Sequence, residues 1–161
     1  MFCWLKRFRK NKMDRNRVFE QLKFDEGVVY EIYADPLGYP TFGVGHLITD
    51  SDPEAGQPIG TAVSEQRVWS AFESDLDISV SECHALYGEG TFNRFPAEVQ
   101  EILVNMMFNM GRNRLSKFKK MNAALLESDW AEAAVEGRDS LWYQQVTKRA
   151  ERLMTRMENV A

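Results

Sequence analysis

The chain of 161 residues is poor in the side chains that form covalent cross-links or bind metal ions. Its two cysteines, Cys3 and Cys83, lie in very different sequence contexts, so we predict no disulfide framework; this content fits synthesis in a reducing cytoplasm. Its two histidines, His46 and His84, lack the spacing of metal ligands, and we expect no metal ion. The segment Gly43-Val-Gly45 is too short for a dinucleotide-binding loop, and we expect no cofactor.

Long apolar segments are missing as well. No stretch is long enough to span a membrane, so we expect no stable membrane insertion. A short apolar start precedes a basic cluster, which reverses the order found in a secretory signal. We interpret residues 1–13 as a basic, flexible extension; the alternatives are an arm that touches anionic lipid or wall polymer, and sequence upstream of a true start at Met13. Its basic residues are Lys6, Arg7, Arg9, Lys10 and Lys12.

A net positive charge is also absent. The formal net charge is −4, and the basic extension contributes +5, so the remainder of the chain is near −9. This balance argues against electrostatic capture by an anionic polymer, and we expect no nucleic-acid partner. The length suits one domain or two small lobes that share a core, and the chain is expected to be a monomer.

The most informative pattern for chemistry is Glu26, followed nine positions later by Asp35 and six positions after that by Thr41. Cleavage of a glycosidic bond needs one carboxylic acid to protonate the leaving oxygen and a second carboxylate on the other side of the anomeric centre. Asp14 can cap a helix that Gly27 ends, which places Glu26 in the last helical turn. A negative charge there faces the negative end of the helix dipole, which favours the protonated form that a general acid needs.

Asp35 lies in a different local setting. Residues 28–34 are predicted to form a strand, and Asp35-Pro-Leu-Gly38 is a strong turn signal in which the aspartate often only hydrogen-bonds the backbone. Residues 39–46 are predicted to return as a second strand that carries Thr41. A hairpin beside a helix end would bring Glu26, Asp35 and Thr41 together.

The segment from Phe24 to Leu47 resembles the catalytic segment of the phage T4-type lysozymes, the endolysins that cut peptidoglycan. The resemblance covers residues 16–158 and rests on Glu-(eight residues)-Asp-(five residues)-Thr followed by Gly-x-Gly-His. Three later segments follow in the same order as in that family: Asn105-Met-Met-Phe-Asn-Met-Gly111, Trp130-Ala-Glu-Ala-Ala-Val135 and Trp142-Tyr-Gln-Gln-Val-Thr-Lys-Arg-Ala150.

The resemblance implies roles for particular residues. Glu26 would be the proton donor, Asp35 the second carboxylate and Thr41 the residue that helps to place a water molecule. Leu47 and Phe108 match positions that line the saccharide cleft. The resemblance also implies supporting residues: His46, structural rather than catalytic and paired with Asp75, and Arg149, paired with the acid carboxyl. Met121 and Glu136 depart from the family at two further subsite positions.

The fold class that we expect is α+β and mostly helical, with two lobes. A small antiparallel sheet would lie in an N-terminal lobe at about 14–62, and a long helix at about 64–87 would join it to a helical C-terminal lobe at about 91–161. Ser64 is predicted to cap the connecting helix, and a buried helix is predicted from Pro96 to Gly111. Further helices are predicted to start near Leu115, at Asp129 with a capping-box Glu132, and at Thr147.

The function implied by the resemblance is hydrolysis of the β-1,4 bond between N-acetylmuramic acid and N-acetylglucosamine in peptidoglycan. The enzyme would be made in the host cytoplasm and act on the cell wall, with a separate membrane-permeabilising protein for release. Two alternatives stay open: a non-catalytic wall-binding module and a lytic component of a phage tail. Inversion at the anomeric carbon is the expected stereochemistry.

Overall fold

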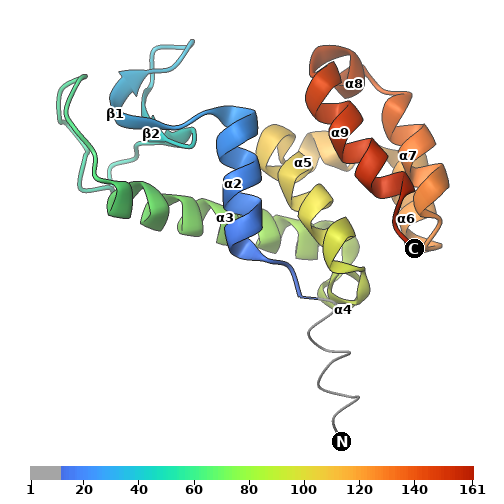
Figure 1. The fold of residues 1–161 in the computed structure, drawn as a ribbon. Coiled ribbons are helices and arrows are strands. Elements are labelled where there is room, and N and C mark those ends of the chain that lie inside the picture. The colour runs from blue at the N-terminus through green and yellow to red at the C-terminus, as the bar shows by residue number, and fades with distance from the viewer. Residues whose placement is uncertain (1–11) are drawn as a thin grey trace, which may run out of the picture. The chain divides into compact units, whose positions relative to one another are not determined.

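The computed structural model describes residues 12–161, and these residues form mostly helices and one small sheet (Figure 1). Residues 1–11 of the basic extension lie outside the described residues. The expected α+β, mostly helical fold class is confirmed. In chain order, the elements are α2 (Arg15–Glu26), β1 (Val29–Ala34), β2 (Pro40–Gly43), β3 (His46–Leu47), α3 (Glu65–Tyr87), α4 (Glu89–Arg94), α5 (Ala97–Leu115), α6 (Lys119–Leu126), α7 (Trp130–Arg138), α8 (Leu141–Gln145) and α9 (Thr147–Glu158).

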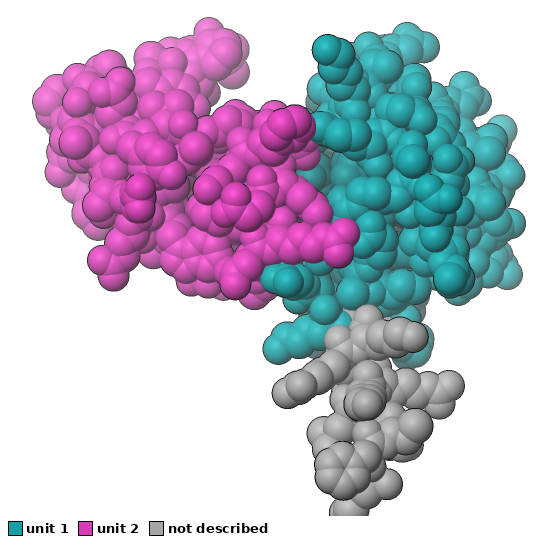
Figure 2. Space-filling model, in the orientation of Figure 1, with its two compact units in different colours: residues 1–14, 79–161 teal, residues 15–78 magenta. Residues whose placement is uncertain are grey.

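The chain divides into two compact units (Figure 2). Unit 2 comprises residues 15–78, and the described part of unit 1 comprises residues 12–14 and 79–161. The boundary falls within α3, so this helix contributes residues to both units. The expected start of α3 is confirmed, because the hydroxyl of Ser64 accepts a hydrogen bond from the Arg67 N–H at 3.1 Å.

Unit 2 contains a three-stranded antiparallel sheet in the order β1-β2-β3. The single strand predicted over residues 39–46 is wrong, because the chain turns at residues 43–45 and forms β2 and β3 instead. Gly43 and Gly45 both have positive φ angles, 65° and 66°, a conformation that side chains with a Cβ atom disfavour. The turn places Thr41 of β2 opposite Leu47 of β3, and opposite Tyr33 of β1 on its other side.

The core of unit 2 lies between the sheet and the first turns of α3. It contains Ile32 of β1, Phe42 of β2 and Val68 of α3, all at most 1% exposed. Gly43 approaches α3 so closely that an added Cβ atom would lie 3.1 Å from Cγ1 of Val68. The end of β2, where the turn begins, is therefore packed directly on α3.

Unit 1 is formed by helices. The long buried helix α5 begins one residue later than expected, with Pro96 as its N-cap, and its regular geometry is interrupted at Gly111 (φ 80°, ψ 166°). The prediction of a helix starting near Leu115 is wrong, because Leu115 ends α5 and α6 begins at Lys119. The Asp129 cap is confirmed: its carboxylate accepts a hydrogen bond from the Glu132 N–H at 3.0 Å.

A close approach between helices marks the centre of unit 1. α7 packs against both α6 and α9. Gly137, in the last turn of α7, is buried, and an added Cβ atom would lie 2.2 Å from Sδ of Met154 and 3.3 Å from Sδ of Met121. A glycine is thus required here by space rather than by backbone conformation.

We expect Gly137→Ala to lower the free energy of unfolding by about 1–3 kcal/mol, because the methyl group forces the methionine side chains out of a packed position. Urea unfolding followed by circular dichroism measures this change. Gly90→Ala in α4 is the matched control, since its Cβ atom would meet only the end of the Arg94 side chain at 3.3 Å and alanine favours a helix. Equal stability of Gly137→Ala and the wild type would show that the methionines move aside without loss of packing.

Candidate functional site

Glu26 is the last residue of α2, and its side chain is exposed. The helix ends there because Gly27 adopts a left-handed conformation (φ 77°) and its N–H donates to the carbonyl of Lys23 at 2.9 Å. The predicted position of Glu26 in the last helical turn is therefore observed. The carboxyl group emerges from α2 where the chain turns into β1.

Asp35 follows directly after β1 and closes the turn to β2. Its Oδ1 accepts hydrogen bonds from the N–H groups of Leu37 at 2.9 Å and Tyr39 at 2.8 Å. Its backbone N–H donates to the Tyr39 carbonyl at 2.9 Å, so both the backbone and the side chain of Asp35 bind Tyr39 across the turn. Among the described residues no hydrogen bond is recorded for Oδ2, which leaves that oxygen available to accept a proton or a hydrogen bond.

Thr41 lies in β2 and is buried, with 4% of its surface exposed. Its Oγ1 donates a hydrogen bond to the carbonyl of Tyr39 at 3.0 Å, and the same Tyr39 donates its N–H to Asp35. The hydroxyl and the carboxylate are thus connected through one backbone residue. A hydroxyl that donates in this way still has lone pairs with which to accept a hydrogen bond.

Tyr33 was not predicted as a site residue, yet the charges of both candidate carboxylates affect the pKa of its phenol. Burial is the largest cause that raises the pKa of Tyr33, and the negative charges of Asp35 and Glu26 raise it further. Both carboxylates therefore lie within electrostatic reach of one side chain. The available signal in the sequence was the alternation of a strand, which places residues 33 and 35 on the same face.

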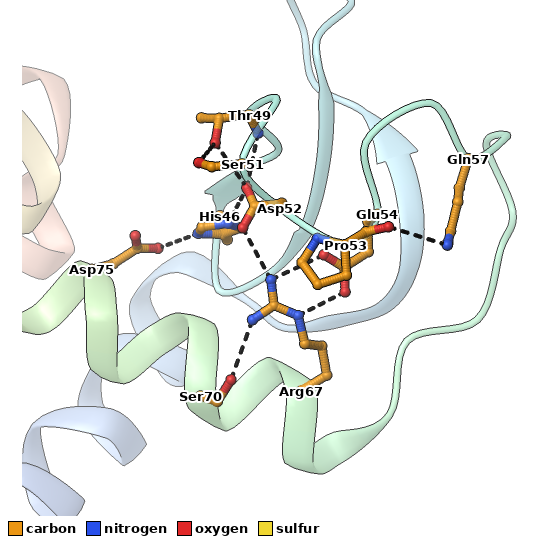
Figure 3. A network of polar contacts seen from close by, with 10 residues as sticks. All are labelled: His46, Thr49, Ser51, Asp52, Pro53, Glu54, Gln57, Arg67, Ser70 and Asp75. Atoms are coloured by element: carbon orange, nitrogen blue, oxygen red, sulfur yellow. Dashed lines mark hydrogen bonds and ion pairs between the residues drawn. The ribbon is translucent and has the colours of Figure 1, made fainter.

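His46, in β3, is held between two carboxylates of unit 2 (Figure 3). Its Nδ1 lies 2.8 Å from Oδ2 of Asp75 on α3, and its Nε2 lies 3.0 Å from Oδ2 of Asp52. The contact with Asp75 implied by the resemblance is present, whereas Asp52 was not expected to take part. The hydrogen bond to Asp75 is the largest cause that raises the pKa of His46, with burial opposing it and Asp52 adding to the rise.

Arg67 of α3 extends this network to a second pair of acidic side chains (Figure 3). Its guanidinium donates to Glu54 through Nε at 2.7 Å and through one terminal nitrogen at 3.0 Å, and that nitrogen also donates to Oδ1 of Asp52 at 3.0 Å. The hydrogen bond from Arg67 is the main cause that lowers the pKa of Glu54. The sequence offered no periodicity or motif that joins these residues.

The remaining predicted residues lie on separate units. Leu47 belongs to unit 2 and is 48% exposed, whereas Phe108 belongs to α5 of unit 1 and is half-buried. Arg149 is buried in unit 1, where its Nε donates to Oδ1 of Asn105 at 2.9 Å. Its pairing with Glu26, a residue of unit 2, stays a prediction.

A pocket of about 630 Å³ opens in unit 1 around the start of α6. Its basic residues outnumber its two acidic residues, and its apolar lining includes Trp142, whose Nε1 donates to Oδ1 of Asn109 at 2.9 Å. Such a surface suits a ligand that carries both apolar and anionic groups. The lining residues are Met110, Arg114, Lys117, Phe118, Lys119, Lys120, Met121, Glu136, Asp139, Ser140, Leu141 and Trp142.

Residues 12–161 contain no group of three or more His, Cys, Asp or Glu side chains suited to hold a metal ion. Over the same range, each helix is too short or too polar to cross a membrane. Carboxylates such as those of Glu26 and Asp35 in unit 2 can transfer protons and activate water.

Comparison with known proteins identifies the family that most of the chain resembles. Residues 23–159 match the family described as phage lysozyme. The probable T4-type lysozyme 2 of Dictyostelium discoideum is 32% identical over 156 residues, covering 86% of this chain and 92% of the relative. The probable T4-type lysozyme 1 of the same organism is 30% identical over 159 residues, with the same coverage of 86% and 92%. The pre-baseplate central spike protein Gp5 of Enterobacteria phage T4 is 35% identical over 154 residues, which cover 83% of this chain and 26% of Gp5.

Proposed function

Because the chain belongs to the phage lysozyme family, whose members are glycoside hydrolases, we propose that it is a muramidase acting on bacterial peptidoglycan. The bond cleaved is the β-1,4 linkage between N-acetylmuramic acid and N-acetylglucosamine, and the biological result is lysis of the host cell. The observation that carries the proposal is that unit 2 contains Glu26, Asp35 and Thr41. The charges of both carboxylates raise the pKa of Tyr33 in the same unit.

Glu26 acts as the general acid in this proposal. It is the last residue of α2, so its carboxyl group lies where the chain turns into β1. The proton passes to the glycosidic oxygen as the bond to the anomeric carbon breaks. The exposed position of the side chain is consistent with access to a polymeric substrate.

Asp35 acts as the general base, and Thr41 helps to position the attacking water. The turn engages Oδ1 of Asp35 with two backbone N–H groups, which fixes the carboxylate and leaves Oδ2 to accept a proton from water. The Thr41 hydroxyl donates to Tyr39, so its lone pairs face the water as acceptors. Removal of one proton by Asp35 then turns the water into the nucleophile.

Substrate contacts are proposed on each unit separately. Leu47, which is half exposed and pairs with Thr41 across the sheet, offers an apolar contact for a sugar ring next to the proposed water site. Phe108 offers an aromatic face on unit 1. The basic pocket of unit 1 complements the carboxylates that peptidoglycan carries. His46, Asp75 and Arg149 have supporting roles that keep these elements in place.

A second candidate function is that of a tail component used for phage entry. It is favoured by the similarity to Gp5, in which the matching region is only 26% of a longer spike protein. The chemistry would be the same, and the difference would lie in what the enzyme is attached to. Copurification of the chain with assembled phage particles, as opposed to its accumulation free in the infected cell, separates the two.

Glu26→Gln is expected to reduce turnover of purified peptidoglycan by about 10²–10⁴-fold, because the amide keeps the shape of the side chain but has no proton to donate. Muropeptide analysis after digestion measures the rate. Glu20→Gln, in the same helix, is the control, since within residues 12–161 Glu20 pairs only with Lys23, on the surface at 3.2 Å. If the wild type binds walls but releases no muropeptides, the chain is a non-catalytic wall-binding module and the proposal fails.

The stereochemical prediction is inversion at the anomeric carbon. A water molecule between Asp35 and the sugar requires the two carboxyl groups to be about 6.5–9.5 Å apart, whereas a retaining enzyme holds them about 5–5.5 Å apart. Proton NMR of the reducing sugar formed first should show the α-anomer. A β-anomer at early times would mean retention and would remove the water-positioning role of Thr41.

The pocket prediction concerns Lys120→Gln. An exposed ion pair with the substrate is worth about 0.5–1 kcal/mol, so KM for soluble peptidoglycan fragments should rise about two- to fivefold at low salt while kcat is unchanged. The effect should vanish at high salt, where exposed charges are screened. Lys148→Gln removes an exposed charge outside the pocket and is the control. An equal rise in KM for both variants would assign the effect to net charge.

A further inference from the structure

The segment of residues 49–57, here called the 49–57 loop, follows β3 and contains no helix or strand. Successive turns shape it, such as the hydrogen bond from the Asp52 N–H to the Thr49 carbonyl at 3.0 Å. Two of its acidic side chains nevertheless point inward: Glu54 is 7% exposed, and the side chain of Asp52 is 15% exposed. Acidic groups are buried in a loop only when cationic partners compensate for lost hydration.

Asp52 is the acceptor on which the loop contacts converge (Figure 3). Its Oδ2 accepts from Nε2 of His46 at 3.0 Å and from the N–H of Thr49 at 2.8 Å. Its Oδ1 accepts from Arg67 at 3.0 Å. This one carboxylate therefore joins the loop to β3 through His46 and to α3 through Arg67.

The two contacts of His46 determine its charge. Both ring nitrogens face carboxylate oxygens, Nδ1 that of Asp75 and Nε2 that of Asp52, and an ionised carboxylate can only accept. Both contacts exist together only when both nitrogens carry hydrogen, that is, when the ring is an imidazolium. A neutral ring has one N–H group, so one contact is lost and its nitrogen lone pair then faces a negative charge.

This arrangement reaches the proposed water site through the sheet. β3 contains only two residues, and it pairs His46 with Phe42 and Leu47 with Thr41. The Phe42 ring lies 5.0 Å from the His46 ring and 5.3 Å from the Arg67 guanidinium, measured between ring centroids and to the guanidinium carbon. A strand this short is held mainly by what its side chains contact, so the strand opposite Thr41 depends on His46.

We propose that Asp52 is a positioning residue: it keeps His46 an imidazolium and, through its contact with Arg67, fastens the 49–57 loop and β3 to α3, which fixes Thr41 and Leu47. Loss of the His46 proton opens this connection. The effect on catalysis rests on the role proposed above for Thr41, whereas the connection itself does not.

The direction of the pH dependence follows from the groups around His46. Asp75 contacts the ring from α3, and Asp52 contacts it from the loop. Arg67 of α3 lies one contact further away, where it binds both Asp52 and Glu54. Because the pKa of His46 is raised in the folded protein, mainly by Asp75, its contribution to stability is complete below the ordinary value of 6.5 and is lost as pH rises through the raised value. For Asp52, burial alone would raise the pKa, but hydrogen bonds from Thr49 and His46 lower it, so its contribution is present above 3.8 and is lost as pH falls through the lowered value.

The test compares Asp52→Asn with Asp50→Asn in the full chain. Asp50 is an exposed residue of the same loop that takes no part in the network, so its variant controls for the loss of one negative charge. NMR titration of the His46 ring should show its midpoint at lower pH in Asp52→Asn and unchanged in Asp50→Asn, with His84 of unit 1 as an internal reference.

Arg67→Gln should move the His46 midpoint in the opposite direction, to higher pH, because it removes a cation near the ring. Both Asp52→Asn and Arg67→Gln should speed hydrogen exchange of the loop amides.

Kinetics then separate positioning from simple loss of stability. In Asp52→Asn, the pH at which kcat falls on the alkaline side should move down together with the His46 midpoint, and above it kcat should drop by up to about 100-fold with KM less affected. A purely structural role would lower activity equally at every pH. An unchanged midpoint of the His46 titration in Asp52→Asn overturns the proposal. If Asp52→Asn does not fold, a His46 midpoint that moves to lower pH in Arg67→Gln overturns it instead. If the wild type has no activity on peptidoglycan while the NMR shifts are as expected, the proposed function fails and the connection stands.

Discussion

The capture of two backbone N–H groups by one oxygen of Asp35 is the interaction on which the candidate site depends. It closes the turn between β1 and β2, and so decides where β2 begins and where Thr41 lies. The same two hydrogen bonds hold the carboxylate in place, because an aspartate side chain has only two bonds about which to rotate and fixing Oδ1 restricts both. The structural explanation of an Asp-Pro-x-Gly turn and the functional explanation are therefore compatible at this residue: Oδ1 makes the turn, and Oδ2 is left for chemistry.

This double use explains why the two carboxyl groups are not interchangeable. A glutamate at position 35 would carry its oxygens one methylene further out and would miss the turn. An aspartate at position 26 would be withdrawn towards the end of α2, where the chain already bends away at Gly27. Each acidic residue thus has the length that its backbone setting requires.

Local sequence signals predicted much of the fold. Caps at Ser64 and Asp129 and the stop at Gly27 were correctly predicted because each is decided by hydrogen bonds within a few residues. The break at residues 43–45 was missed because its alternation reads as one strand, and the close contact of Gly43 with Val68, far along the chain, decides where the strand ends. Asp52, Arg67 and Tyr33 were missed for the same reason: their importance comes from partners brought together by folding, and neither periodicity nor motif records such pairs.

Tyr33 gives the site a property that can be observed with light. A phenol absorbs differently when it ionises, and the ionisation of Tyr33 is opposed by the charges of Glu26 and Asp35. Substitution of either carboxylate with an amide removes part of that opposition and lowers the pH at which the phenolate forms. An absorbance titration of Tyr33 therefore measures how strongly each of the two acidic groups acts on it in the free protein, without any substrate.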